Sequence, residues 1–520
     1  MRAVLFVLAA ASAFQPETAK TVTTPKFNGL RGRGRAAVAQ VEETSTAGPL
    51  SIQSREALMD DKLALLGVSR YQALMAIFVA MVYAADGAEV MVMSLVSRTL
   101  VEKWALADWK QGLLGMSVYS GMFTGGLTCG PVADGKGRSF TLITATAMIA
   151  LFGVLSAYAP NLELLCLARF IAGVGMGASL PVSSSLLQET VPKAWKGGLA
   201  CLVFSGFNLG ELFAAKAGVL AFNRADPSTW LFLVAALPAI ATFVVSLIVP
   251  ESPRFLANNG NVRGVRRWFV RAARINGKNL QTILGPEPDE TAAALCAVGK
   301  PPKRAKKTEP KPQIRSPVAL VADKFGGLFV KELRLRTLVL WVLWMAANAA
   351  FYGSIFSLPE ALRFSKTAAN DVNFDVARGI SQVSAYQSLA FLFFMPLVAL
   401  GVKYSFLFPL AFAGGFLALF SAMLSTNFAA AAPLPGHLVA CLAFAKFFYN
   451  GVFMMLYPLT GESYPTTTRA TGTAIAGTVG RVCTILVAPV CTRLQQISAL
   501  LPYQVFIVTS ALAFLASLLL

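Results

Sequence analysis

Long runs of apolar residues recur along this chain, and each run has the length of a helix that crosses a lipid bilayer. Six runs precede a long polar interval, and six follow it. A spanning helix needs about 20 mostly apolar residues, and lipid offers open backbone groups no hydrogen-bond partner, so helices are expected. The predicted spans are Tyr71–Val96, Gly112–Val132, Phe140–Tyr158, Leu162–Ser183, Gly198–Phe222, Trp230–Val249, Leu335–Leu358, Val383–Gly401, Phe406–Leu424, His437–Leu459, Thr471–Arg493 and Tyr503–Leu520.

The composition supports a membrane protein. Of the 520 residues, 56% are hydrophobic and 14% are charged, whereas soluble domains carry about 25% charged residues. A water-soluble fold could not cover so much apolar surface. We therefore predict an all-α membrane protein with twelve transmembrane helices in two six-helix halves.

The net charge of +19 is concentrated in the polar interval between the two sets of runs. The middle of that interval, Gly285–Ser316, is rich in Pro, Lys and Glu, a composition typical of disorder. A basic stretch between membrane helices is better explained by the positive-inside rule than by nucleic-acid binding. Both termini are expected on this basic side, where anionic lipid headgroups would be attracted.

The first residues have the features of targeting segments. Met1–Ala13 combines a basic start, a short apolar run and a small-residue end, which is typical of a signal peptide. Residues 14 to about 45 have transit-peptide composition. Because Phe14 follows the expected cleavage point, the segment resembles the bipartite presequence of algae with complex plastids. A plastid envelope is the expected location; a secretory signal or disordered tail, and an endomembrane or plasma membrane, are the alternatives.

The two halves contain matching segments. In each half an acid is followed three residues later by proline and four residues after that by a base. These residues are Glu189, Pro192 and Lys196 in the first half, and Glu462, Pro465 and Arg469 in the second. A parallel repeat of six helices is the architecture of one large class of transporters. The chain divides into a signal peptide (1–13), a transit peptide and disordered tail (14–66), a six-helix half (67–249), a basic, partly disordered loop (250–334) and a second six-helix half (335–520).

The loop after the second run carries a recognisable motif. It reads Gly130-Pro-Val-Ala-Asp134-Gly135-Lys-Gly137-Arg138-Ser139, which resembles the major facilitator signature G-x-x-x-D-R-x-G-R-[RK]. The segment Pro250-Glu251-Ser252-Pro253-Arg254 resembles the one after the sixth helix in the sugar-porter branch. Segments that start at Ala85, Tyr352, Glu462 and Gly480 resemble the synaptic-vesicle-protein-related and organic ion transporter subgroup.

The resemblance implies a transporter that works by alternating access, with loops on the basic side that latch an inner gate between the halves. The gate residues that it implies are Gly130, Asp134, Arg138, Glu189, Arg254, Glu462 and Arg469. Gly135 and Ser139 replace basic residues of the signature, and the second-half copy near Lys403 has lost its pattern. These departures predict a weaker or asymmetric gate. The seventh run lacks the sugar-porter Gln-Gln-x-x-Gly-x-Asn motif, which argues against a hexose.

Charged residues inside the predicted spans are the main candidates for function. A charge at mid-bilayer costs at least ~2.5–3.5 kcal/mol on insertion scales, so it normally faces a cavity or a partner. Asp86 and Glu89 lie three residues apart in the first run and share one helical face. The residues of this kind are Asp86, Glu89, Arg169, Glu211, Lys216, Lys446 and Arg481.

In the family that the motifs resemble, helices one, four, seven and ten line the central cavity, and a carboxylate on helix one faces an arginine on helix four. The resemblance therefore implies Asp86 as the proton acceptor, with Glu89 as the second candidate. Burial and a nearby cation act on such a carboxylate in opposite directions, so its protonation can follow the opening of the cavity. A cation in the cavity suits a carboxylate or phosphate of the substrate. The expected substrate-binding residues are Arg169, Lys446, Glu211, Tyr352 and Asn348.

Structural roles are the alternatives for several of these residues. Asp86 or Glu89 can belong to a structural ion pair, and Arg169 can simply lock helices four and one together. One of Glu211 and Lys216 can extend to an interface, with its stem along apolar surface.

The predicted function is proton-coupled transport of a small organic solute. An organic anion is favoured over an organic cation, because four intramembrane cations stand against three acids. Uncoupled facilitation is an alternative, and so is a non-transporting scaffold or sensor of the same fold. The seven cysteines form no C-x-x-C pair, and the sequence offers no zinc site and no catalytic cysteine with a histidine partner. Because no nucleophile–base pairing or metal cluster is recognisable, no enzyme activity, metal or cofactor is expected. The expected partners are the substrate, protons and the lipid bilayer; the protein is expected to be a monomer and to bind no nucleic acid.

Overall fold

The computed structural model describes most of the chain. The described ranges are residues 52–107, 110–222, 224, 226–296, 328–331, 333–364, 372–399, 404–428, 435–464 and 469–519. The expected signal peptide, most of the expected transit peptide and tail, and residues 297–327 of the basic loop lie outside them. The side chains of Glu462 and Arg469, two expected gate residues, also lie outside the described part.

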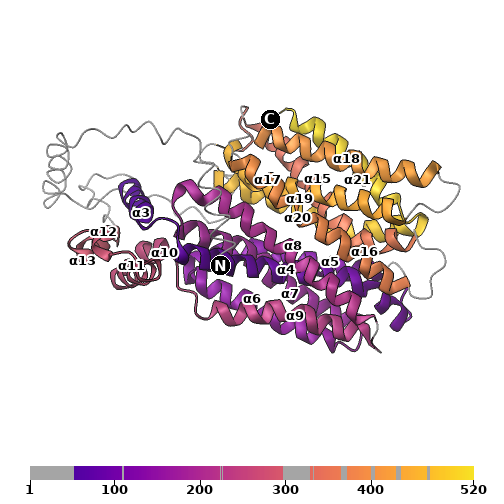
Figure 1. Ribbon diagram of the computed structural model, residues 1–520, viewed down its shortest axis with the longest axis horizontal. Helices are drawn as coiled ribbons and strands as arrows, with labels where there is room; N and C mark the ends of the chain where they lie inside the picture. The colour runs from indigo at the N-terminus through magenta and orange to yellow at the C-terminus, as the bar shows by residue number, and fades with distance from the viewer. Residues whose placement is uncertain are drawn as a thin grey trace, which may run out of the picture.

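The helices form two halves that lie side by side (Figure 1). The first half comprises α4 (Arg70–Lys103), α5 (Gln111–Lys136), α6 (Arg138–Ala157), α7 (Leu162–Thr190), α8 (Lys196–Ala221) and α9 (Pro227–Ser246), with the short η4 (Lys193–Trp195). The second half comprises α15 (Arg334–Phe364), α16 (Val372–Gln387), α17 (Ala390–Ala399), α18 (Tyr404–Phe428), α19 (Pro435–Ser463), α20 (Arg469–Ile497) and α21 (Leu501–Ser517). The halves meet where α5 packs on α20, α8 on α16 and α17, and α4 on α15.

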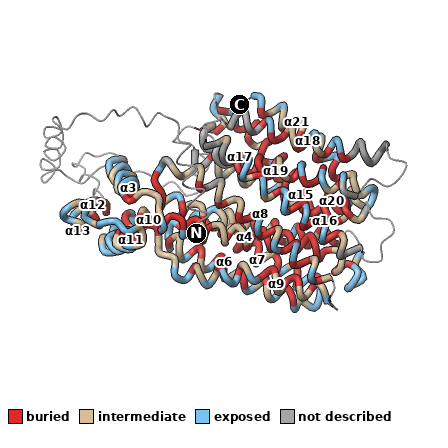
Figure 2. The backbone as a smooth tube through the Cα atoms, in the orientation of Figure 1, coloured by how far each residue is buried: buried red, intermediate tan, exposed pale blue. Residues whose placement is uncertain are grey.

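The bundle has the surface of a membrane protein. Within the described residues, seven helices are long and apolar enough to span a bilayer, namely α4, α6, α7, α9, α15, α19 and α20. Large apolar side chains such as Leu151, Leu220 and Leu417 are exposed on the bundle, as expected where lipid replaces water as the solvent. Figure 2 shows burial concentrated on inner helices such as α4 and α15, whereas α6 and α9 expose more of their length. The predicted all-α membrane fold is confirmed.

The eighth predicted span differs from the helix that forms. We expected Val383–Gly401, but α16 begins at Val372, ends at Gln387 and is followed by α17 from Ala390. The first half of α16 is polar, so hydropathy does not reveal it as part of a span. Val376 and Ala377 in this part of α16 are nevertheless buried, and α16 packs against α8 and α19.

A group of short helices covers one end of the first half (Figure 1). It contains α3 (Ile52–Leu66), α10 (Pro253–Asn258), α11 (Val262–Asn276), α12 (Leu280–Leu284) and α13 (Pro288–Cys296). We call this end of the bundle the basic side and the opposite end the far side. The sequence suggested a disordered tail up to residue 66 and an irregular loop here. Helices form instead because apolar residues of α3, α11, α12 and α13 share one buried cluster, and burying their apolar faces outweighs the ordering of the chain.

Helix α11 shows the local signals clearly. The Asn261 side chain accepts a hydrogen bond from the backbone N–H of Gly264 and caps the helix start. Gly277 ends the helix in the left-handed conformation, at a φ of 67° that glycine adopts without strain. Trp268 and Phe269 lie on its buried face, and the arginines lie on the other.

Close helix contacts in the first half depend on glycine. Gly206 and Gly210 of α8 lie directly against the backbone of α4. A Cβ added at Gly210 would stand 1.9 Å from the carbonyl oxygen of Ala84, and one at Gly206 would stand 2.2 Å from that of Ala80. Small residues at such positions let membrane helices approach closely, which gives them packing energy that lipid does not supply.

We expect Gly210→Ala to destabilise the folded protein. The new methyl group would overlap the α4 backbone, and overpacking costs about 1–3 kcal/mol. The midpoint of thermal unfolding in detergent, followed by tryptophan fluorescence, measures the effect. Gly135→Ala is the matched control, because a Cβ at Gly135 meets nothing within 4 Å. Equal midpoints for the two variants would show that the α4–α8 approach does not depend on glycine.

Candidate functional site

Charged side chains buried within the described bundle define the candidate site. None of the five is more than 2% exposed, and they are Asp86, Glu89, Arg169, Glu211 and Lys446. Lys216, which the sequence placed among the intramembrane charges, is exposed. Arg481 of α20 lies directly over Gly126 of α5 and so helps to join the two halves.

Arg169 lies entirely among groups of the first half. Its Nη1 donates to Glu89 at 2.6 Å and its Nε donates to the Ser156 hydroxyl at 2.8 Å. Its Nη2 donates to the carbonyl oxygens of Phe152 and Gly153. The guanidinium also lies over the ring of Phe232, 5.1 Å from its centroid. Its donors are thus occupied, and the geometry supports the alternative role in which Arg169 and Glu89 lock α4, α6 and α7 together.

Asp86 lies one helical turn before Glu89 and has a different environment. Its Oδ2 accepts a hydrogen bond from the Ser179 hydroxyl of α7 at 2.9 Å. Its Oδ1 is buried and has no partner in the described structure. Asp86 therefore carries an oxygen that can accept a proton, as expected for a coupling residue, although no cation contacts it among the described residues.

A second group of buried polar residues lies between the two halves, and we call it the interhalf cluster. It consists of Asn208 and Glu211 of α8, Gln387 of α16 and Lys446 of α19. The Lys446 ammonium donates to Glu211 Oε2 at 3.2 Å. The Gln387 amide donates to the same oxygen and, at 2.7 Å, to Asn208 Oδ1. One carboxylate oxygen therefore connects the first half to two helices of the second.

The interhalf cluster keeps unused hydrogen-bonding capacity. Buried atoms without a partner in the described structure include Glu211 Oε1, Gln387 Oε1 and Asn208 Nδ2. Both amide atoms of Asn450, one turn beyond Lys446 on α19, are also unpartnered. Buried polar groups are normally satisfied, so this concentration of open donors and acceptors marks a place where a polar ligand can bind.

Aromatic side chains from both halves form a second part of the candidate site. Phe204 and Phe207 of α8 face Phe351 of α15 and Phe453 of α19, with Phe351 and Phe453 ring centroids 4.9 Å apart. Tyr352, an expected substrate residue, packs edge-on against these rings. Phe207 directly precedes Asn208 in the chain, so the aromatic group and the interhalf cluster adjoin on α8.

Asn348, another expected substrate residue, is held inside the second half. Its Nδ2 donates to the carbonyl oxygen of Trp344, and its Oδ1 accepts from the Thr484 hydroxyl at 2.9 Å. The bond from Thr484 joins α15 to α20, and the bond to Trp344 lies within α15. Asn348 therefore positions Trp344, whose ring contacts Phe453.

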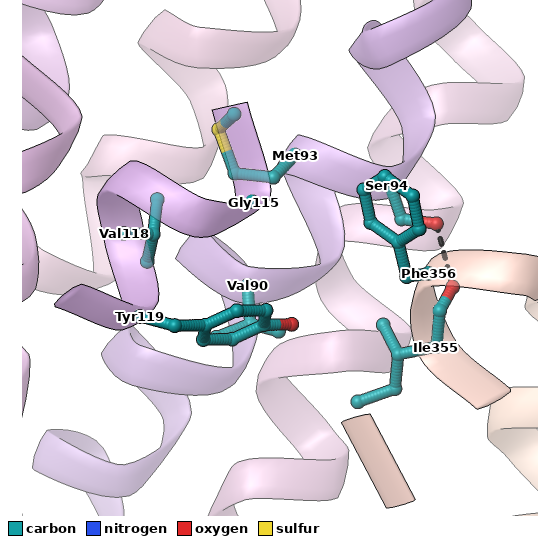
Figure 3. A pocket seen from close by; sticks show the side chains of 8 residues that line it. All are labelled: Val90, Met93, Ser94, Gly115, Val118, Tyr119, Ile355 and Phe356. Carbon is teal, nitrogen blue, oxygen red and sulfur yellow. Dashed lines mark hydrogen bonds between the residues drawn. The ribbon is translucent and has the colours of Figure 1, made fainter. Parts of the chain in front are cut away.

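A small cavity lies between the halves toward the far side. Its lining comes from α4, α5 and α15, and includes Val90, Met93, Tyr119 and Phe356 (Figure 3). Beside it the Ser94 hydroxyl donates to the carbonyl oxygen of Ile355 at 2.7 Å, across the two halves (Figure 3). Because α4 starts near the basic side and Ser94 lies in its later part, these contacts close the halves together toward the far side.

The expected gate residues of the first half meet on the basic side. Arg138 contacts Glu189 and Asp134, each at 3.2 Å. Arg254 pairs with Asp60 of α3. Gly130 is exposed, and a Cβ added there would meet nothing within 4 Å. The described partners all belong to the first half and its attached helices.

Sequence reasoning missed three members of this network: Asp60, Glu251 and Ser252. Glu251 accepts from the backbone N–H groups of Arg138 and Ser139 at the start of α6, where a carboxylate is favoured. Ser252 donates its hydroxyl to Glu189. Glu251 and Ser252 were visible as part of a motif, but their partners were not.

Lys196 lies beside this network at the start of α8. Burial lowers the pKa of its ammonium, and the nearby Arg254 lowers it further, while Asp60 and Glu189 act in the opposite direction. The basic side therefore carries a balanced set of charges that does not involve the interhalf cluster.

Comparison with known proteins assigns the chain to a family. Residues 72–519 match the family described as "Sugar (and other) transporter". Since the match covers most of the chain, the protein belongs to this family of the major facilitator superfamily. Its members and the relatives below are transporters rather than enzymes.

The chain is similar to several curated transporters. It is 27% identical over 414 residues to the niacin transporter NiaP of Acinetobacter baylyi, covering 79% of this chain and 84% of the relative. It is 26% identical to the organic cation/carnitine transporter 7 of Arabidopsis thaliana, covering 87% and 92%. It is also 26% identical to the 4-hydroxybenzoate transporter PcaK of Acinetobacter baylyi, covering 80% and 83%. Proteins named as synaptic vesicle 2-related are among its relatives too.

A solved structure supports the fold. The xylose transporter XylE from E. coli, in a partially occluded inward-open conformation, superposes with a TM-score of 0.62. The match covers 86% of this chain and 98% of XylE at 16% identity. The two-half architecture read from the helices is therefore that of the major facilitator fold.

We expect Arg169→Ala to destabilise the first half strongly, because it leaves Glu89 buried without its cation. Removing one partner of a buried ion pair costs about 3–5 kcal/mol. Replacing both charges, as Arg169→Met with Glu89→Gln, should recover much of that loss. The thermal unfolding midpoint in detergent distinguishes the variants. If Arg169→Ala unfolds at the wild-type temperature, the pair does not lock these helices.

Proposed function

We propose that the protein is a secondary transporter of small organic anions, and that aromatic carboxylates are its substrate class. The proposal rests mainly on one observation: Lys446 is a buried cation on the inner surface between the halves. Among the described residues, only Glu211 accepts a hydrogen bond from this ammonium, which has three N–H donors. A carboxylate needs a cation that can still donate hydrogen bonds, and Lys446 provides one.

The aromatic group beside Lys446 supports the ring part of the substrate. Phe207, Phe351, Tyr352 and Phe453 come from three helices of both halves. Aromatic rings favour edge-to-face and offset contacts with another ring, so an aromatic acid can place its ring here and its carboxylate on Lys446. The relatives named for niacin and 4-hydroxybenzoate transport aromatic carboxylates.

Transport by alternating access follows from this placement. The site residues come from both halves, so a substrate bound between them can be exposed first to one side and then to the other as the halves rock. In this arrangement Lys446 and Tyr352 contact the substrate, and Glu211 is the partner of Lys446 before the substrate binds. Arg169 and Asn348 support them by holding their own half rigid.

Proton coupling is part of the proposal, with Asp86 as the acceptor and Glu89 as the second candidate. In the described structure both Asp86 and Glu89 have a buried carboxylate oxygen without a hydrogen-bond partner, but Glu89 is paired with the cation Arg169 and Asp86 is not. Transport of an organic cation is the second candidate function, because one relative is named for organic cations and carnitine. In that case Asp86 would face the cation. Uncoupled facilitation and a non-transporting scaffold remain outcomes of the test below.

We expect purified protein in liposomes to take up aromatic carboxylates, faster with an acidic exterior. Lys446→Gln should raise the KM about tenfold or more, because hydrogen bonds to charged groups contribute about 1.5–3 kcal/mol. Lys216→Gln is the matched control, since this lysine of α8 is exposed and should leave uptake unchanged. Labelled nicotinate and 4-hydroxybenzoate are suitable probes.

Other outcomes of this assay separate the alternatives. Uptake of a quaternary ammonium compound that is lost in Asp86→Asn would favour the cation transporter. Carboxylate uptake at a rate that does not depend on the proton gradient would indicate an uncoupled facilitator. Absence of all uptake by folded protein would contradict the transporter proposal.

We further propose that the protein resides in a plastid membrane of a complex-plastid alga, on the sequence of its first residues. Phe14→Ala should prevent plastid import of a fluorescent fusion, because the residue after the expected cleavage point is the distinguishing feature of the segment. Phe27→Ala, in the same segment, is the control. Identical localisation of the two variants, or plastid import without residues 1–45, would refute the location.

A further inference from the structure

The two buried ion pairs differ in what they connect. Arg169 and Glu89 both lie in the first half. Glu211 lies in the first half and Lys446 in the second. Any motion that separates the halves in this region must therefore break or shift the Glu211–Lys446 contact, whereas the Arg169–Glu89 pair can travel with its half as a rigid unit.

The surroundings of Glu211 allow such a break. Its Oε2 accepts both hydrogen bonds, from Lys446 and Gln387, and its Oε1 accepts none. The charged and titratable groups that face it are Lys446 of α19 and, at longer electrostatic range, Tyr119 of α5. The amides of Asn208 and Gln387 supply the remaining contacts. Lys446 is thus the only cation in contact with Glu211 among the described residues.

Charge balance then restricts what can happen when a substrate binds. In the empty protein, the ammonium and the carboxylate neutralise each other inside the bundle. A substrate carboxylate on Lys446 takes the place of Glu211. Glu211 would then be a buried anion without a cation, which is strongly unfavourable, unless it takes up a proton. The neutral acid can stay where it is, with its O–H directed to the oxygen of Gln387 that has no partner.

We propose that Glu211 is an internal substitute for the substrate carboxylate. It occupies Lys446 when the transporter is empty, and it is released by one proton for each carboxylate that binds. The proposal rests on the proposed carboxylate transport and assigns the coupling proton to Glu211 in place of Asp86. The charges balance in this exchange. Before binding, Lys446 is paired with ionised Glu211. After one carboxylate and one proton have bound, Lys446 is paired with the substrate carboxylate and Glu211 is neutral.

The proposal makes Glu211 necessary for one half of the transport cycle only. In Glu211→Gln the substrate carboxylate still neutralises Lys446, so the loaded transporter can open its site to the other side of the membrane. The empty variant has a buried ammonium without an anion, so the conformational change that returns its empty site to the first side of the membrane is slow. Exchange of one carboxylate for another should therefore persist, while net accumulation driven by a proton gradient should be lost.

The experiment compares exchange and net uptake in the same liposomes. Labelled nicotinate or 4-hydroxybenzoate is used for wild type, Glu211→Gln and the control Glu163→Gln, whose side chain is exposed at the start of α7. We expect Glu211→Gln to keep exchange within about threefold of wild type and to lose net accumulation by about tenfold or more. The variant should also bind the carboxylate without pH dependence, whereas wild-type binding weakens as pH rises.

A second measurement does not depend on the stability of a variant. Binding of the carboxylate to wild-type protein in weakly buffered detergent solution should take up about one proton per bound molecule, as read by a pH indicator. Glu211→Gln should take up none. Wild type that binds or exchanges no aromatic carboxylate would refute the proposed function itself. Wild-type exchange with no proton uptake, or a folded Glu211→Gln variant that loses exchange, would overturn the role of Glu211. A Glu211→Gln variant that still accumulates substrate would overturn it too and would leave Asp86 as the coupling residue.

Discussion

A charge buried among membrane helices must be neutralised or fully hydrogen-bonded, and the arrangement of this protein follows from how it meets that constraint. The described part of the bundle buries two ion pairs. Arg169 gains acceptors from a carboxylate, a hydroxyl and two carbonyl groups, so its pair is closed and its half is rigid. In the described structure the Lys446 ammonium makes one hydrogen bond, to Glu211, so this pair is open to a competitor.

The helix contacts within the first half also differ from those between the two halves. Glycines bring α8 against α4 at backbone distance in the first half, and the buried Arg169 fixes α4 to α6 and α7. Between the halves the contacts are of another kind, with a hydroxyl–carbonyl bond at Ser94, an aromatic group, and the interhalf cluster. Tight contacts within a half and separable polar contacts between halves are what a rocking motion requires.

The polar helix α16 shows how the constraint overrides hydropathy. Its first turns carry Asp375 and Arg378, yet Val376 and Ala377 are buried there, and at the other end of the helix Gln387 reaches Glu211 and Asn208. An irregular or polar segment is tolerated at membrane depth when protein surrounds it. The break between α16 and α17 therefore lies beside the candidate site, and not at the lipid surface.

The sequence by itself determined the membrane class, most of the helices and the family, because apolar length and a few loop motifs are local properties. It also identified the charges that matter, since a charge in an apolar run is visible without a structure. It could not identify their partners: Glu89 and Arg169 are 80 residues apart, and Glu211 and Lys446 are 235 residues apart. The neutral Asn208 and Gln387 gave no signal at all, and α3 became helical only through α11 and its neighbours. Only the tertiary structure decided that Arg169 is fully hydrogen-bonded and that Lys446 can still bind a ligand. The reason is that the hydrogen bonds of a buried charge depend on every helix that surrounds it.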